Sequence, residues 1–237
     1  MTHQDIVCGD ACALARAFEP HRPTVVITDP IWPNRNKKLF PGVDAHELLH
    51  DVLEQLVGKV SHVVLQVGCM TDPRFMSAVP SHWPYWRTCW MRYSHPTPLG
   101  MTLMGSDVAY VFGEPRRPTL AQVAAGEAPV PSEWTAAGKR GRGRSKHPCP
   151  RDVSHARWLV RWFSLPGELV LDPFAGKGTT LVAAKEHGRD ALGWENVPEF
   201  CELARTELAQ CEMFDFHGNG DVLAPSQFDL LTYGTSA

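Results

Sequence analysis

The segment from Glu168 to His187 constrains the fold of this chain more than any other. An apolar run over 168–171 predicts a buried strand, and a helix is expected over about 179–187. Between them lies Asp172-Pro173-Phe174-Ala175-Gly176-Lys177-Gly178, whose small residues let the backbone approach a ligand and leave helix N–H groups free. A strand, a glycine-rich turn and a helix in this order are typical of a ligand-binding edge in a parallel sheet.

Strands alternate with helices along most of the chain. Apolar runs predict strands at 6–8, 24–27, 62–67, 107–112, 168–171 and 190–194, and helical spacing predicts helices at about 46–57, 152–163, 179–187 and 198–210. This alternation predicts an α/β fold with a mostly parallel, doubly wound sheet and helices on both faces.

Length and composition fit a single domain. The 237 residues, 43% of them hydrophobic, are enough for one large core with a modest insertion, so we expect one domain spanning 1–237. Residues 114–146 show no convincing periodicity and end in a run rich in Lys and Arg, so we expect an insertion or loop there. The aromatic stretch Trp83–Trp90 is expected to be mainly core.

Cysteine spacing and charge exclude several classes of protein. The seven cysteines fall in no CxxC or CxxH spacing, and their odd number suits reduced thiols, so we expect no metal site. A net charge of -3 argues against a protein that coats nucleic acid over its whole surface. No apolar run approaches the roughly 20 residues of a membrane helix, and no secretory signal is visible, so we expect a cytoplasmic protein without a membrane partner.

An acidic residue about twenty positions after the turn strengthens the prediction of a ligand site. The strand expected at 190–194 runs into Glu195, and a carboxylate at that distance is placed to accept hydrogen bonds from ribose hydroxyls. The turn alone could be a tight connection, and Glu195 alone a solvated side chain. Together they favour a cofactor that contains a nucleoside.

Two other nucleotide-binding motifs do not fit the turn. Gly178 follows Lys177 where a phosphate-binding loop requires Ser or Thr, and no glycine precedes the lysine at the required distance. The GxGxxG pattern of dinucleotide-binding turns is also missing. The sequence therefore argues against nucleoside triphosphate hydrolysis and hydride transfer.

The turn resembles the motif that binds S-adenosylmethionine (SAM) in the DNA amino-methyltransferases, whose pattern Asp-Pro-Phe-x-Gly-x-Gly-Thr-Thr matches residues 172–180. Thr28-Asp29-Pro30-Ile31-Trp32-Pro33-Asn34 resembles the same family's catalytic Asp-Pro-Pro-Tyr/Trp/Phe motif at a strand end. The catalytic motif precedes the SAM motif, as in the circularly ordered β class. The resemblance covers nearly the whole chain and implies a Rossmann-like methyltransferase fold.

The resemblance also implies which residues hold the cofactor. Asp10 resembles the family's acidic residue near the cofactor adenine, although a surface turn explains it nearly as well. His147 lies in a segment that resembles the lining of the methionine end of SAM, although it could equally cap a helix. The expected SAM-binding residues are Asp10, Asp29, His147, Asp172, Pro173, Phe174, Ala175, Gly176, Gly178, Thr179, Thr180, Glu195 and Asn196.

The resemblance implies catalytic roles for Asp29, Pro30 and Trp32. An exocyclic amine is a poor nucleophile because its lone pair is delocalised into the base. If the Asp29 carboxylate and the Pro30 carbonyl each accept one N–H, the nitrogen is drawn toward a tetrahedral state with its lone pair directed at the methyl group. Trp32 offers a flat face for a base extruded from the duplex.

One position departs from the family pattern, since Ile31 stands where the family usually has proline and so loosens the backbone. A strand-end turn with a packed tryptophan is the alternative explanation of the motif. A protein that binds SAM and DNA without turnover is the alternative function. Asp29 and Glu195 are intact and favour the enzyme.

Two basic segments are expected to contact double-stranded DNA, one directly after the catalytic motif and one in the insertion at 114–146, which is also expected to form part of a target-recognition element. Their expected DNA-contacting residues are Asn34, Arg35, Lys37, Lys38, Arg140, Arg142 and Arg144, with Arg116 and Arg117 nearby. Both segments could instead be solvated surface. The insertion is small for reading a DNA site alone, so the sequence leaves a homodimer open.

The identity of the methylated base rests on the resemblance alone. Asp29 before the proline, and Trp32 at the fourth position, favour adenine N6, because members that methylate cytosine N4 more often carry Ser in place of the Asp. Cytosine N4 stays the alternative. RNA is the less favoured substrate because no RNA-binding module is visible.

Overall fold

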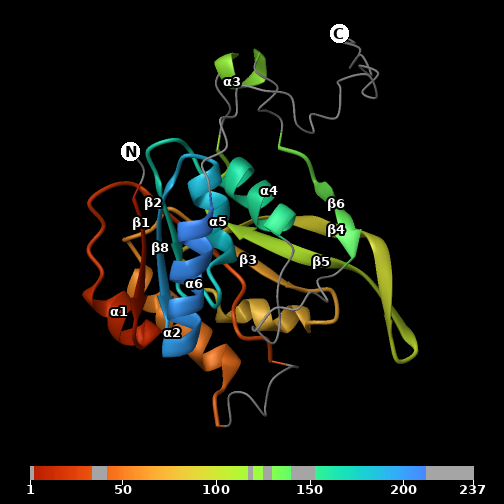
Figure 1. The fold of residues 1–237 in the computed structure, drawn as a ribbon, viewed down its shortest axis with the longest axis horizontal. Helices are drawn as coiled ribbons and strands as arrows, with labels where there is room; N and C mark the ends of the chain where they lie inside the picture. Colours follow the sequence, from red (N-terminus) through yellow and green to blue (C-terminus); the bar gives the residue numbers. More distant parts are fainter. Residues whose placement is uncertain (1–2, 34–41, 117–119, 125–129, 140–152, 212–237) are drawn as a thin grey trace.

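The structure is a computed structural model that describes residues 3–33, 42–116, 120–124, 130–139 and 153–211. Within these ranges eight strands form one sheet in the order β1-β8-β7-β2-β3-β5-β4-β6 (Figure 1). The strands are β1 (Gln4–Cys8), β2 (Thr24–Thr28), β3 (His62–Gly68), β4 (Tyr85–Leu99), β5 (Thr102–Phe112), β6 (Glu133–Lys139), β7 (Leu169–Asp172) and β8 (Asp190–Glu195).

The strand directions confirm the predicted α/β fold with a mostly parallel sheet. β1, β8, β7, β2 and β3 are neighbours and run parallel to one another. β5 is antiparallel to β3 and to β4, and β6 lies parallel to β4 at the edge. Because the carboxyl ends of parallel strands meet at one edge, the residues that follow β2, β7 and β8 come together there.

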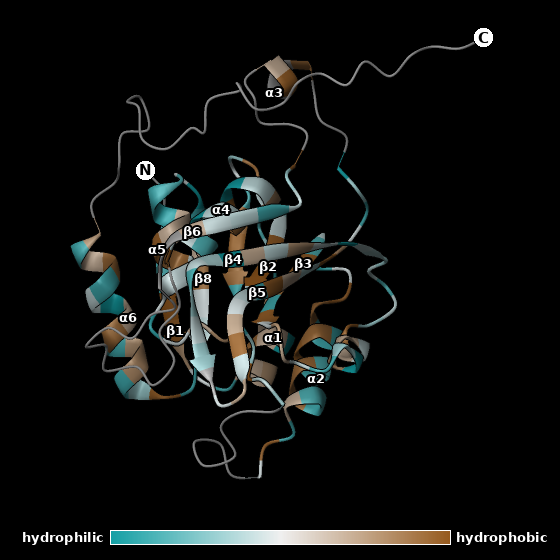
Figure 2. Cartoon of the chain, turned by 90° about the vertical axis from the view of Figure 1, so that its right-hand side faces the viewer, coloured by the Kyte–Doolittle hydropathy of each residue, from teal (hydrophilic) through white to brown (hydrophobic). Residues whose placement is uncertain are grey.

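The helices form a layer on each face of the sheet (Figure 2). The described helices are α1 (Ala11–Ala17), α2 (Ala45–Leu56), α3 (Leu120–Ala124), α4 (Val153–Phe163), α5 (Thr179–Glu186) and α6 (Pro198–Gln210), with a 3-10 helix η1 (Pro73–Ala78). α1 and α2 pack on one face, and α4, α5 and α6 pack on the other. Every residue of β2 and β3 is buried, as expected for central strands covered on both sides.

α2 shows how local sequence produces these layers. Asp44 caps its first turn, since its side chain accepts hydrogen bonds from the backbone N–H groups of His46 and Glu47. Leu49, Val52, Leu53 and Leu56 recur at helical spacing and are at most 1% exposed. Burying each such side chain contributes about 1.5–3 kcal/mol, which fixes the face that α2 turns to the sheet. No helix in the described ranges is long and apolar enough to cross a membrane.

Besides β4 and η1, two segments form elements that the sequence analysis did not predict. Asp10 accepts a hydrogen bond from Ala13 N at 2.8 Å and caps the short helix α1. The prediction that 114–146 has no regular structure is wrong for α3 and for β6, which pairs with β4. β6 has no strong alternation of its own and forms because the outer edge of β4 offers it a hydrogen-bonding ladder.

Candidate active site

The predicted catalytic motif begins at the carboxyl end of β2, in the middle of the sheet. β2 lies between β3 and β7, so Asp29 and Pro30 leave the sheet between two other strands. Asp29 Oδ1 accepts a hydrogen bond from the Nε1–H group of Trp32 at 2.8 Å. The indole therefore fixes one oxygen of the carboxylate within the motif.

The Trp32 ring is buried and is only 5% exposed. A Cβ atom on Gly68, the last residue of β3, would lie 2.5 Å from Cζ3 and 2.8 Å from Cη2 of the ring. Glycine at position 68 therefore lets the indole lie directly against the strand. The sequence predicted a flat face open to an extruded base, and the structure instead shows a ring packed into the core on the α1–α2 face.

A hydrogen bond joins the end of β2 to the glycine-rich loop that follows β7. Thr28 Oγ1 donates to Asp172 Oδ1 at 2.6 Å, and Phe174 N donates to the same oxygen at 3.1 Å. Thr28 directly precedes Asp29, and Asp172 is the first residue of the predicted SAM motif. The two predicted motifs are thus held together at one edge of the sheet.

The carboxyl group of Asp172 is only 3% exposed. Burial raises its pKa from 3.8 to about 6, against the lowering effect of hydrogen bonds from Thr28, Thr180 and Phe174, and the negative charge of Asp29 adds to the increase. Asp172 therefore organises the loop from inside the protein and is poorly placed to contact solvent.

The glycine-rich loop that precedes α5 packs against both β8 and α6. Ala175 N donates to Trp194 O at 2.9 Å, which ties the loop to β8. Gly178 has a φ of 82°, and a Cβ atom there would lie 3.0 Å from Cβ of Ala204 on α6. Both the backbone conformation and the close approach require glycine at 178.

Glu195, at the end of β8, faces this loop. Its Oε2 accepts a hydrogen bond from Gly176 N at 2.9 Å, and its Oε1 accepts one from Val197 N at 2.9 Å. Burial raises the pKa of the Glu195 carboxyl, while backbone N–H groups, including that of Asn196, lower it. A carboxylate offers about four acceptor positions, so Glu195 keeps acceptor capacity for hydroxyl groups of a ligand.

Asp10 lies at the same edge, after β1. Gly9 N donates to Glu195 O at 2.9 Å, which brings the ends of β1 and β8 side by side. Asp10 itself caps α1, so the surface turn that the sequence allowed is a helix cap. The cap does not conflict with the predicted position near the cofactor.

The remaining predicted residues fall into two groups. Pro173, Phe174, Thr179 and Thr180 lie in the loop and the first turn of α5, where the sequence placed them. Eight predicted site residues lie outside the described residues, and their placement stays a prediction: Asn34, Arg35, Lys37, Lys38, Arg140, Arg142, Arg144 and His147.

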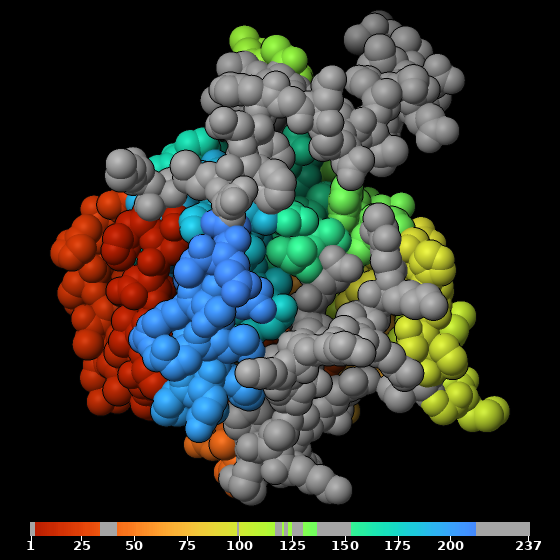
Figure 3. Space-filling view, in the orientation of Figure 1, coloured from red at the N-terminus to blue at the C-terminus, as the bar shows by residue number. Residues whose placement is uncertain are grey.

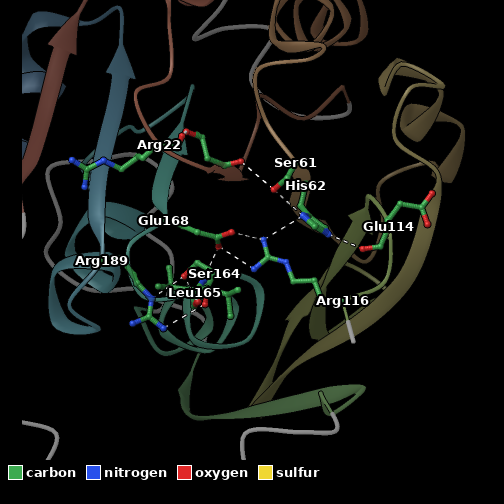
Figure 4. Close-up of polar contacts among 11 residues, drawn as sticks. Arg22, Ser61, His62, Glu114, Arg116, Ser164, Leu165, Glu168 and Arg189 are labelled. Carbon is green, nitrogen blue, oxygen red and sulfur yellow. Dashed lines mark hydrogen bonds and ion pairs between the residues drawn. The ribbon is translucent and has the colours of Figure 1, made fainter. Parts of the chain in front are cut away.

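Arg116 overturns one expectation about DNA contacts. Its guanidinium donates to both carboxylate oxygens of Glu168, at 3.0 and 2.9 Å, and also to His62 Nδ1 at 3.3 Å (Figure 4). His62 begins β3 and Glu168 directly precedes β7, so this cluster lies at the amino ends of the parallel strands. Arg116 stabilises the edge of the sheet opposite Asp29.

Sequence reasoning did not single out two residues that shape the site. The hydroxyl of Thr28, directly before the motif on a buried strand, was a usable signal for a polar contact at the strand end. Gly68 carried no signal, because its role depends on the Trp32 ring that tertiary structure brings to it.

Comparison with known proteins identifies the family. A model of the N6/N4 DNA methylase family matches residues 81–206, just over half of the chain. The chain belongs to this family. The matched part of the methylase contains the loop 172–180 and Glu195, whereas Asp29 and Trp32 lie before it.

Individual relatives extend over most of the methylase. YubD of Escherichia coli (strain K12), which bears the name of a methylase, is 26% identical over 220 residues, covering 85% of this chain and 88% of YubD. A solved structure of TTHA0409 from Thermus thermophilus, described as a DNA modification methylase, has a TM-score of 0.63 at 23% identity and covers 89% of this chain and 96% of that one. TTHA0409 is also solved in complex with SAM.

A third similar protein is the PvuII DNA methyltransferase, described as specific for cytosine N4. Its TM-score is 0.63 at 14% identity, and the alignment covers 87% of this chain and 86% of that one. At this identity the likeness shows the shared fold. The fold is therefore shared with a protein whose name gives cytosine N4 as its target.

Proposed function

We propose that this methylase transfers a methyl group from SAM to N6 of adenine in double-stranded DNA, with Asp29, Pro30 and Trp32 at the reacting centre. The observation that carries the proposal is the hydrogen bond of 2.6 Å between Thr28 and Asp172, which holds the amine-activating motif beside the cofactor loop. The domain spans residues 1–237, and the basic residues of 34–38 and 140–144 contact DNA phosphates.

The residues at this edge fit SAM, which when bound supplies an electrophilic methyl group on a positively charged sulfur. The Glu195 carboxylate has acceptor capacity for ribose hydroxyls, and the loop at Gly176 and Gly178 brings backbone close to a ligand. Asp29 and Glu195 add negative charge that favours a cation at this edge. The SAM complex of TTHA0409, which has the same fold, supports this choice of cofactor.

The chain's own contribution to chemistry is to bind and orient the amine. The Pro30 carbonyl and the Asp29 carboxylate accept the two N–H groups of the base, and the nitrogen lone pair then projects away from both oxygens. The hydrogen bond from Trp32 sets the orientation of that carboxylate before the base arrives. Because this orientation is preset, less reorganisation is needed when the amine binds.

Adenine N6 is favoured over cytosine N4 by the residue types of the motif. Asp29 and Trp32 resemble the motif of family members that methylate adenine N6, and this resemblance supports the choice. Ile31 in place of proline does not favour either base. The two bases share the same amine chemistry, so the mechanism is unchanged if cytosine is the target.

The test is transfer of labelled methyl from SAM to unmethylated duplex DNA of varied sequence, followed by digestion and nucleoside analysis. The proposal predicts labelled N6-methyladenine. N4-methylcytosine would keep the mechanism and overturn the choice of base. Measurable SAM binding and DNA binding without any methylated base would overturn the proposed activity.

A further inference from the structure

The β4–β5 hairpin extends well beyond the rest of the sheet. Thr97, Pro98 and Leu99 of β4 pair with Met104, Leu103 and Thr102 of β5, which makes a two-stranded end (Figure 1). In the space-filling view the yellow tip stands out from the body of the protein (Figure 3). We call residues 94–103 the arm.

The arm rises from the edge of the sheet that carries Asp29. Gly68 is the last residue of β3 and pairs with Asp107, so the part of β5 that precedes Asp107 continues past the end of β3. Thr28 pairs with Leu65, which places the ends of β2 and β3 on this same edge. The arm therefore stands beside the proposed reacting centre.

The root of the arm is fixed by buried polar contacts. Tyr93 donates its hydroxyl hydrogen to Asp107 Oδ2 at 2.6 Å, and both residues are at most 4% exposed. The Tyr93 ring lies over His155 of α4, with 4.8 Å between ring centroids. The register of β4 against β5 shifts between Arg92 and Thr97, where the arm begins. The arm is thus held at its base by β4, β5 and α4.

The surface chemistry of the arm suits a DNA groove. Between Arg92 and Asp107 the sequence has no Asp or Glu, so the arm carries no carboxylate that phosphates would repel. Met101 is fully exposed and Leu103 is 64% exposed. Methionine, leucine and threonine side chains can contact thymine methyl groups, and a two-stranded ribbon fits the major groove.

A second copy of the chain is a less suitable partner. Pro96 and Pro98 remove N–H donors from the outer strand of the arm, and proline at an open edge disfavours pairing with another strand. The adjoining strand β6 ends at Lys139, which pairs with His95 at the base of the arm. The residue that β6 adds next to the arm is therefore basic, which suits DNA phosphates.

We propose that the arm, residues 94–103, enters the major groove of the duplex beside the target base. This inference rests on the proposed function, because it takes duplex DNA as the substrate. The arm then supplies base contacts in addition to the phosphate contacts proposed for the two basic segments.

Substituting one exposed tip residue by three side chains of similar length tests the proposal. Met101→Lys, Met101→Gln and Met101→Glu differ chiefly in charge at a position with no packing to lose. We expect the dissociation constant for a short fluorescent duplex of mixed sequence to rise from Lys to Gln to Glu. The salt slope of Met101→Lys should be steeper than that of Met101→Gln by about one. Tyr85→Glu, at the opposite end of β4 where Tyr85 is 59% exposed, is the matched control and should bind as the wild type does.

The outcomes separate the arm from the proposed function. If the three variants bind DNA with equal affinity while the wild type still binds and methylates DNA, the proposed DNA contact of the arm is wrong and the proposed function is kept. Wild type that neither binds nor methylates DNA would overturn both. Unchanged DNA affinity together with a shift of Met101→Glu from dimer to monomer in sedimentation would show that the arm contacts a second copy, which also overturns the proposal.

Discussion

Trp32 donates its indole N–H to Asp29 Oδ1 over 2.8 Å, three residues along the same turn. The ring that makes this hydrogen bond is buried against Gly68, so its position is set by β3 as well as by the motif. In this arrangement the tryptophan orients the carboxylate, and its buried ring is not open for the base stacking that the sequence predicted.

Trp32→Phe tests the orienting role, because phenylalanine keeps an aromatic ring in the core and lacks the N–H group. A hydrogen bond to a charged group contributes about 1.5–3 kcal/mol. We therefore expect kcat for methyl transfer to fall about tenfold or more, with SAM affinity unchanged. Steady-state kinetics with a separate SAM-binding measurement checks this.

Trp83→Phe is the matched control for that substitution. Trp83 is also buried, at 4% exposed, and its Nε1–H group donates to Val60 O at 3.1 Å, away from Asp29. An equal loss of kcat in both variants would mean that Trp32 acts through stability alone.

Gly68→Ala tests the close packing of the Trp32 indole on β3. The added methyl group would lie 2.5 Å from the ring, and overpacking of this kind typically costs about 1–3 kcal/mol of unfolding free energy. Gly105→Ala places its Cβ 3.9 Å from the nearest atom, so chemical denaturation should show little change in that variant. Equal stability of the two variants would contradict the close packing of Trp32 on β3.

Asp172→Asn tests the buried carboxyl through the pH dependence of stability. The unfolded chain releases this proton near pH 3.8 and the folded chain near pH 6, so its contribution to stability is full below pH 3.8 and is lost as pH rises through 6. The difference corresponds to about 3 kcal/mol. Denaturation at several pH values should show wild type losing stability relative to Asp172→Asn across this window, and a constant difference would contradict the account.

Glu195→Gln tests the cofactor side of the site. The substitution keeps the shape of the side chain and removes its charge and part of its acceptor capacity, so we expect SAM to bind about tenfold more weakly, which corresponds to about 1.4 kcal/mol. Duplex DNA affinity should not change. Glu202→Gln, on the exposed ion pair with Arg205 of α6, serves as the control for loss of one carboxylate and should leave SAM binding intact.

The sequence predicted the parts of the fold that have strong local patterns. The apolar runs of β2, β3 and β7 and the helical spacing of α2 and α6 gave elements within a few residues of those observed. α1 was missed because Ala11–Ala17 has a weak apolar pattern, although Asp10 is a good helix cap. β6 was missed because its pairing with β4 depends on tertiary contact.

The site was predictable where chemistry follows chain order and unpredictable where it depends on contacts across strands. The strand-end positions of Asp29, Asp172 and Glu195 followed from the motifs. The burial of Trp32 and the hydrogen bond from Thr28 required β3 and β7 to be placed beside β2. Arg116 was assigned to a DNA surface because the sequence did not reveal Glu168 as its partner.

Methyl transfer by Asp29→Ala tests the central claim most directly. The variant removes the carboxylate proposed to accept the amine N–H and leaves the loop 172–180 and Glu195 unchanged. With labelled SAM at concentrations that saturate the variant and with unmethylated duplex DNA, the account predicts that methyl incorporation is lost although SAM still binds, more weakly than to the wild type. Incorporation at the wild-type rate would contradict the assignment of Asp29, and with it the proposed reacting centre.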